Sequence, residues 1–454
     1  MKRKYIALTL SILMTGSIFM GCGKKETAEE GDKIQISYIN WNLATEEENN
    51  IERRMIEEYE KKNPNIDIVI ADYIDTTDYA NSLTTAAAAG KLPDVVALQT
   101  LPSSLSNEWV RDISEFVEND EDWNKISKPV VESTKFGNGT YAIPAGQFLA
   151  GYMVNKELFE KENVKQPQIG YTFEELETAI KAMTQPNKNI VGLGNELSML
   201  EWYPVLKNES FGWNTFDGEK YNLTDASYKE ILEKTNSFAK NGLVYDALPQ
   251  EQKDKFNGNG EDEVWLQGQI AIRYDGTWSA PAYKNANLSY EFIGLPNNKS
   301  VVVNDYVGIS KTSEHAKEAY DFAKWMTFSK EGTLKRIELA EANDLAWGSL
   351  PILNDEEVNE KYFSWNNIPG VLEVYENLDN SLVEAVKVIP GYAKARWETP
   401  TGVKIGDKEN ATVGDVIFDM VRGTTKPEDY LSQVNDLANQ AYQEANEAIK
   451  QLVE

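Results

Sequence analysis

The spacing of hydrophobic residues switches repeatedly between strand and helix periods after residue 33. Apolar and polar residues alternate where a strand is expected, and apolar residues recur every three or four positions where a helix is expected. In chain order, the pattern predicts a strand, helix, strand, helix and strand over residues 34–38, 45–62, 66–70, 78–89 and 95–98. Thr45 and Glu48 predict a capping box at the start of the first helix, and Gly90 the end of the second. This order predicts an α/β fold with a parallel, doubly wound sheet.

The later part of the chain repeats this organisation. Thr172 and Glu175 predict a second capping box. The same periodicities predict helices over residues 172–183, 228–240, 316–326 and 427–452 and short strands over residues 191–193 and 271–273. Ligands bind beyond the carboxyl ends of strands in open α/β sheets, so the loops at 40–44 and 99–102 are candidate site segments.

The N-terminus has the layout of a secretory signal. Lys2, Arg3 and Lys4 precede an apolar run over residues 5–21 that ends at Gly21-Cys22. A small residue before a sole cysteine resembles the lipobox of bacterial lipoproteins, in which the cysteine is lipidated. We therefore expect a signal peptide over residues 1–21, lipidation (diacyl, palmitate type) of Cys22, a polar stalk over residues 22–33, and an extracytoplasmic protein tethered to the bacterial cell membrane. An uncleaved anchor helix is the alternative.

Composition narrows the classes of function. The formal net charge is −28, with 73 acidic and 45 basic residues, which argues against nucleic-acid binding because phosphate neutralisation needs clustered Lys and Arg. Cys22 is the only cysteine and His315 the only histidine, so a disulfide, a thiolate cluster and a two-histidine metal motif are excluded. No cofactor and no metal are expected, and His315 is interpreted as a surface residue.

Four stretches of the chain carry a family resemblance. They are residues 56–70, 87–98 with their Pro93-Asp94 entry, 140–159, and 268–278, which reads GQIAIRYDGTW. In this order they resemble the family 1 extracellular solute-binding proteins, the maltodextrin-binding-like receptors of ABC importers. The resemblance implies a two-lobed, periplasmic-binding-protein-like α/β fold, each lobe a mostly parallel sheet flanked by helices, joined by a hinge.

The same resemblance implies the lobe boundaries, the ligand and the partner protein. We expect lobe 1 over residues 34–145 and 302–345, lobe 2 over residues 146–301 and 346–454, and crossings near residues 145–149, 302–306 and 345–351. One implied partner is a carbohydrate, expected to be an oligosaccharide, which binds between the two lobes. The other is the permease of an ABC importer. The protein is expected to be a monomer and not an enzyme.

Tryptophan supplies the candidate chemistry of the site. An aromatic face suits the C–H face of a sugar ring, while amide and carboxylate oxygens accept hydrogen bonds from hydroxyl groups. The candidate substrate-binding residues are Trp41, Asn42, Gln99, Gln147, Glu196, Trp202, Asp275, Trp278, Trp347 and Trp397. Core packing is the alternative for Trp202 and Trp347, and Trp109, Trp123 and Trp325 are assigned to packing.

Other functions stay open at this point. Arg273 and Arg396 could hold a carboxylate, so acidic oligosaccharides remain candidates. A receptor for a non-sugar solute, an adhesin and a surface glycoside hydrolase are the rivals. A hydrolase would need two carboxyl groups roughly 5–10 Å apart, and 73 acidic residues cannot exclude such a pair.

Overall fold

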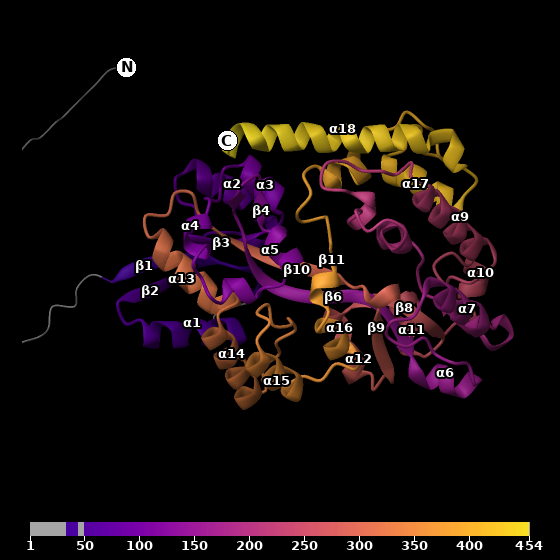
Figure 1. Cartoon of the computed structure of the whole chain (residues 1–454), viewed down its shortest axis with the longest axis horizontal. Helices are drawn as coiled ribbons and strands as arrows, with labels where there is room; N and C mark the ends of the chain where they lie inside the picture. The colour runs from indigo at the N-terminus through magenta and orange to yellow at the C-terminus, as the bar shows by residue number, and fades with distance from the viewer. Residues whose placement is uncertain (1–32, 44–49, 454) are drawn as a thin grey trace, which may run out of the picture.

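One nine-stranded sheet runs through both halves of the molecule (Figure 1). The computed structural model describes residues 33–43 and 50–453. The strand order is β2-β1-β3-β10-β6-β8-β7, and β11 pairs with β10 and β9 with β6. The strands are β1 (Ile34–Ile39), β2 (Ile66–Ile70), β3 (Val95–Leu98), β6 (Ile143–Asn155), β7 (Val191–Leu193), β8 (Ile270–Gly276), β9 (Tyr290–Gly294), β10 (Val301–Ile309) and β11 (Leu382–Val383), with β4 (Lys135–Phe136) and β5 (Gly139–Thr140) forming a separate ribbon.

Helices surround this sheet. Those before β10 are α1 (Ile51–Lys62), α2 (Tyr79–Ala88), α3 (Leu101–Ser106), α4 (Ser114–Val117), α5 (Lys128–Glu132), α6 (Lys156–Glu162), α7 (Phe173–Met183), α8 (Met199–Trp202), α9 (Ala226–Lys240), α10 (Gln250–Lys253), α11 (Glu261–Leu266) and α12 (Ala280–Asn285). Those after β10 are α13 (Ala316–Thr327), α14 (Lys330–Asn343), α15 (Glu356–Trp365), α16 (Val371–Tyr375), α17 (Val413–Arg422) and α18 (Pro427–Val453). The alternation of strands and helices confirms the predicted α/β class.

Local sequence signals explain where several helices begin and end. The Thr172–Glu175 capping box is present at the start of α7, as predicted. Gly90 follows α2 with a φ of +66°, a conformation that glycine adopts without a steric penalty. Helix α1 begins at Ile51 behind Asn50, whose side chain accepts a hydrogen bond from the Arg53 amide. The predicted capping pair Thr45 and Glu48 lies outside the described residues.

Each lobe contains its own set of parallel strands. In lobe 1, β1 pairs in parallel with β2 and β3, and in lobe 2, β7 pairs in parallel with β8. The long strands β6 and β10 pair with each other in antiparallel fashion and pass between the lobes. The segment at Leu350 joins them, because its amide donates to the Gln147 carbonyl (2.8 Å).

The carboxyl ends of the parallel strands face one another across these crossing strands. In lobe 1, β3 is antiparallel to β10 and its last residue, Leu98, pairs with Tyr306 in the middle of β10. In lobe 2, β8 is antiparallel to β6 and its last residue, Gly276, pairs with Ala150 in the middle of β6. Both carboxyl edges therefore point toward the place where β6 and β10 meet, which is where a ligand is expected in sheets of this kind.

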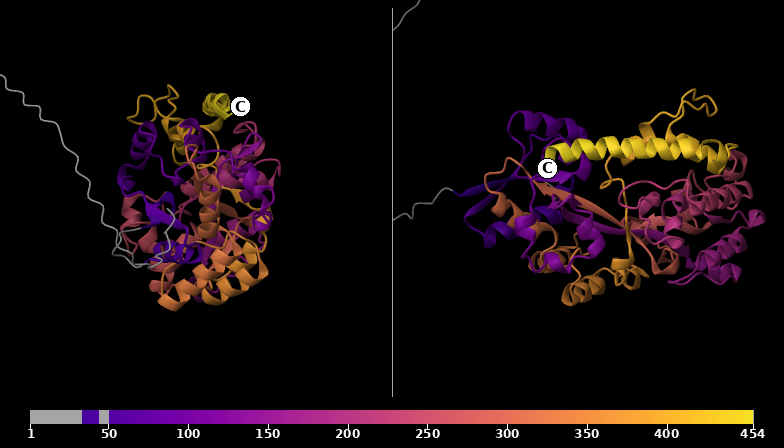
Figure 2. Two further views of the ribbon diagram at one scale, coloured as in Figure 1. Left: turned by 90° about the vertical axis from the view of Figure 1, so that its left-hand side faces the viewer. Right: turned by 45° about the horizontal axis from the view of Figure 1, so that its top comes forward.

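Helix α18 extends along both lobes (Figures 1 and 2). Leu431, Val434 and Ala438 are buried in the hydrophobic core of lobe 2. Ile449, near the other end of the helix, is buried in the core that contains most of lobe 1, where α18 contacts α3. Helix α15 packs against α14. The exact residue boundaries of the lobes remain a prediction.

No helix of the described residues is both long and apolar enough to span a bilayer. The predicted signal peptide, Cys22 and the stalk as far as residue 32 lie outside those residues.

Candidate functional site

Three of the 11 tryptophans, all of which the structure describes, are exposed. They are Trp41, Trp278 and Trp397, with exposed fractions of 37%, 45% and 53%. Burying such a ring in the protein core is favourable, so leaving these three at the surface is informative. All three belong to the predicted substrate-binding set.

The edge of lobe 1 presents Trp41, Asn42 and Gln99. Trp41 follows β1 directly, and its ring meets Tyr79 of α2 edge to face, with centroids 5.7 Å apart. Asn42 is exposed, and its backbone amide donates to the Asn40 Oδ1 atom (2.9 Å). Gln99 is exposed immediately after β3. Because β1 and β3 are parallel neighbours, the loops that carry these three residues lie at the same edge.

The edge of lobe 2 presents Trp278, which follows the charged residues Arg273 and Asp275 of β8. Trp278 lies just after β8 and meets Phe148 of β6 edge to face at 6.0 Å. Asp275 beneath it is buried, accepts from the Tyr283 hydroxyl and the Gly276 amide, and lies 3.3 Å from Arg273 Nη2. The Asp275 oxygens are therefore already engaged within the protein. In this structure Asp275 supports the Trp278 segment.

Glu196 was predicted as a ligand contact, but its carboxylate oxygens also accept hydrogen bonds from within the protein. It is fully buried, and its two carboxylate oxygens accept from Arg422 Nε and Nη2, both at 2.8 Å. Arg422 ends α17, so this bidentate pair joins α17 to the loop after β7. Nearby, burial raises the pKa of Glu261 to about 7, and Arg273 opposes that rise.

Gln147 lies where the three crossing segments meet. It is fully buried, pairs with Asn304 of β10 in register, and its Nε2 atom donates to the Pro351 carbonyl at 2.7 Å. The Gln147 Oε1 atom and both side-chain atoms of Asn304 have no hydrogen-bond partner among the described residues. Buried amide atoms of this kind usually bind ordered water.

Trp202 and Trp347 pack within the protein. Trp202 is fully buried in the lobe 2 core and meets Tyr152 edge to face at 5.8 Å. Trp347 is half-buried between Tyr362 and Trp365. Trp202 has no exposed surface here, which agrees with the core-packing alternative. Trp109, Trp123 and Trp325 are buried, as predicted.

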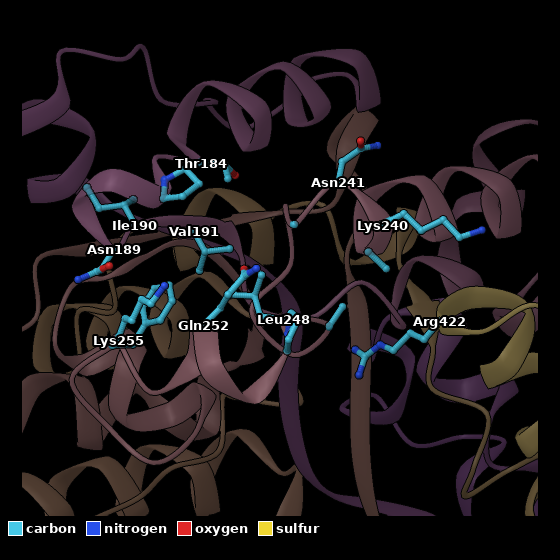
Figure 3. Close-up of a pocket in the computed structure, with 16 residues that line it drawn as sticks. Thr184, Asn189, Ile190, Val191, Lys240, Asn241, Leu248, Gln252, Lys255 and Arg422 are labelled. Carbon is cyan, nitrogen blue, oxygen red and sulfur yellow. The ribbon is translucent and has the colours of Figure 1, made fainter. Parts of the chain in front are cut away.

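Two pockets of lobe 2 are lined in part by the paired arginines Arg396 and Arg422. Trp397 lines a pocket of 370 Å³ together with Leu197, Ile417 and Phe418. A second pocket, of 770 Å³, lies beside β7 at its amino end, and its 16 lining residues include none of the ten predicted residues (Figure 3). Arg422 reaches the wall of that pocket.

Three aromatic residues at these edges were not predicted. Tyr73, 53% exposed, follows β2, whose carboxyl end lies beside that of β1. Phe148 supports Trp278, and Phe418 is exposed on α17 in the pocket of Trp397. Phe418 had a signal in the sequence, because it is an apolar residue outside the apolar stripe of its helix. Within the described residues, no group of His, Cys, Asp and Glu side chains could hold a metal ion.

Two lobes whose strand ends face each other across crossing strands define the class of two-lobed solute-binding proteins. A family model described as bacterial extracellular solute-binding protein matches residues 54–357. The chain belongs to this family, whose members bind solutes for ABC transporters and are not enzymes.

Named relatives agree with this assignment. The maltotriose-binding protein of Pyrococcus abyssi is 24% identical over 335 residues, covering 70% of this chain and 68% of the relative. An ABC substrate-binding protein of Listeria monocytogenes, solved with cycloalternan, is 21% identical and aligns over 90% of this chain and 99% of its own with a TM-score of 0.66. A cyclic alpha-maltosyl-1,6-maltose binding protein of Arthrobacter globiformis is 14% identical, with coverages of 91% and 100% and a TM-score of 0.68. The predicted two-lobed fold is thus confirmed.

Proposed function

We propose that this chain is the substrate-binding lipoprotein of an ABC importer and that it captures a neutral oligosaccharide between its lobes. The exposed Trp41, Trp278 and Trp397 carry the proposal. An exposed indole offers a large, rigid apolar face, which suits the C–H face of a pyranose. More than one such platform favours a ligand with more than one ring.

The polar side chains at the same edges complement this choice. Asn42 and Gln99 are exposed neutral amides that can donate to and accept from sugar hydroxyl groups. Arg273 and Arg396 are paired with carboxylates within the protein, so they are not available to hold an acidic ligand. A neutral ligand fits these edges better than a uronate does.

Delivery follows from the position of the crossing strands. A ligand that touches both edges binds better to a closed arrangement of the lobes and shifts the protein toward it. The permease would then distinguish the closed form from the open one. Lipidation of Cys22 would hold the monomeric receptor at the outer face of the bacterial cell membrane, within reach of that permease.

Intrinsic tryptophan fluorescence tests the proposal. Residues 33–454 are titrated with neutral and acidic oligosaccharides, and each mixture is also checked for cleaved sugar. We expect a saturable change with one class of neutral oligosaccharide. Trp278→Ala should weaken that binding at least about tenfold, since an aromatic platform contributes more than 1 kcal/mol. Leu372→Ala, which removes an exposed apolar side chain from α16, is the control and should leave the affinity unchanged.

Three other outcomes of the titration would contradict parts of the proposal. No response to any sugar would overturn the carbohydrate assignment and favour a non-sugar solute. Binding of acidic sugars alone would show that a cationic side chain has been released from its internal pair. Equal loss of affinity in the two variants would remove Trp278 from the site.

A further inference from the structure

A π-helical turn, η10 (Lys394–Glu398), directs two consecutive side chains to opposite sides. Arg396 points into the interior of lobe 2 and is largely buried, while Trp397 is exposed. Turns of this type are rare and occur frequently at functional sites. The direction of Trp397 therefore depends on what holds Arg396 in place.

The buried carboxylate of Glu201 holds this turn. Glu201 Oε1 lies 2.6 Å from Arg396 Nη2, and Glu201 Oε2 accepts from the Tyr392 hydroxyl at 3.2 Å. Within the described chain, Glu201 is the only carboxylate in ion-pair contact with Arg396. Burial raises the pKa of Glu201, and Arg396 opposes that rise. A buried charge with a single partner is strongly tied to it, because separation leaves both charges uncompensated.

Tyr392 provides a second link from Glu201 to Trp397. Its ring is buried and meets the Trp397 ring edge to face, with centroids 6.0 Å apart and an interplanar angle of 78°. The other side of the turn is fixed by α17. A Cβ atom on Gly414 would lie 2.7 Å from the Arg396 carbonyl oxygen, so only glycine allows this approach.

We infer that Glu201 is a positioning residue, which sets the orientation of the Trp397 ring through Arg396 and Tyr392. The Trp397 ring lines the 370 Å³ pocket together with apolar Leu197, Ile417 and Phe418 and with polar residues, which include Lys408, Thr412 and Asp415. This arrangement suits one sugar ring of a neutral oligosaccharide, with its C–H face against the indole. The inference rests on the proposed function for its ligand, but the orientation of Trp397 can be measured without one.

The first experiment measures the orientation alone. Protein labelled with 5-fluorotryptophan is examined by 19F NMR, and the Trp397 resonance is assigned from its loss in Trp397→Phe. We expect this resonance to shift or broaden in Glu201→Gln and, to a smaller extent, in Tyr392→Phe, which removes only the hydroxyl link. Asp120→Asn is the matched control, since Asp120 is a buried carboxylate in lobe 1 that accepts from Lys324 and the Tyr320 hydroxyl. It should leave the Trp397 resonance unchanged.

The second experiment is a double-mutant cycle on sugar affinity. Glu201→Gln should raise Kd about tenfold in the wild-type background and less than about twofold in Trp397→Ala, because the effect then has no ring to act through. Equal losses in both backgrounds, or an unmoved Trp397 resonance, would overturn the inference. If Glu201→Gln does not fold, Tyr392→Phe replaces it in the double-mutant cycle with Trp397→Ala. Absence of sugar binding by the wild-type protein would instead overturn the proposed function, while the NMR result would still stand.

Discussion

Asp355 accepts from two lysines of lobe 1, Lys125 (2.8 Å) and Lys330 (2.9 Å), whereas Glu261 in lobe 2 has Arg273 at 3.4 Å. Burial opposes ionisation at both sites. The two lysines nevertheless lower the pKa of Asp355 to about 2, while burial raises the pKa of Glu261 to about 7. The pKa values of these two carboxyl groups are thus shifted in opposite directions.

The two lobes also differ in the contacts that lie beside their exposed tryptophans. Beneath Trp278 and Trp397, lobe 2 places buried pairs that include Glu196–Arg422 and Glu201–Arg396. In lobe 1, the turn that carries Trp41 is held by the Asn42 amide on Asn40 Oδ1, by Arg53 Nε on the Leu43 carbonyl, and by the contact between Trp41 and Tyr79. Buried ion pairs contribute little net stability but hold their partners in one arrangement. We therefore regard lobe 2 as the pre-organised half of the site and lobe 1 as the half that adjusts on closure.

The largest expected effect comes from breaking a buried pair in lobe 2. Arg422→Met leaves the fully buried Glu196 without its cation and should lower the free energy of unfolding by about 3–5 kcal/mol. Lys125→Met should cost less than about 1 kcal/mol, because Lys125 is 41% exposed and Asp355 keeps Lys330. Urea unfolding measures both. Similar losses in the two variants would contradict the contrast between the lobes.

A somewhat smaller effect is expected from pH. Glu261 keeps its proton in the folded state up to about pH 7, while the unfolded chain loses it near 4.5. The folded state therefore binds more protons between these values, so the free energy of unfolding should fall as pH rises from 4.5 to 7, by up to about 3 kcal/mol. The stabilisation by Asp355 has the opposite sign, since it is present above pH 3.8 and lost as pH falls toward 2.

Unfolding curves between pH 4.5 and 7.5 check this prediction. Glu261→Gln should flatten the dependence, whereas Asp355→Asn should leave its slope in this range unchanged. An unaltered slope in Glu261→Gln would show that the carboxyl group titrates normally in the folded protein.

Much of the fold was readable from the sequence because it depends on neighbours in the chain. The Thr172–Glu175 capping box, the turn at Gly90 and the strand Val191–Leu193 each need only a few adjacent residues, and all three are present. The family resemblance supplied the order in which these elements pair. Local chemistry and the family pattern together were sufficient for the architecture.

The site was only partly readable, because burial is decided by distant residues. Glu196 and Asn42 are both polar residues in loops that follow a strand, so the sequence predicts a ligand contact for each. The Glu196 carboxylate, however, is bound by Arg422, which lies 226 positions away. Trp202 and Trp397 are both tryptophans in polar-aromatic segments, yet one is in the core and the other at the surface. The π-helical turn that exposes Trp397 has no sequence signature that would distinguish it from an α-helical turn.

The smallest expected effect concerns Trp41, the aromatic platform of lobe 1. Trp41→Ala should raise the Kd for the oligosaccharide about fivefold, equivalent to about 1 kcal/mol, and so less than Trp278→Ala. The reason is that Trp41 rests on one edge-to-face contact with Tyr79 and must be ordered on binding, which offsets part of its contact energy. Calorimetric titration of both variants measures the difference, with Leu372→Ala as the common control. A loss at Trp41 that equals or exceeds the loss at Trp278 would mean that the lobe 1 edge is as well ordered before binding as the lobe 2 edge.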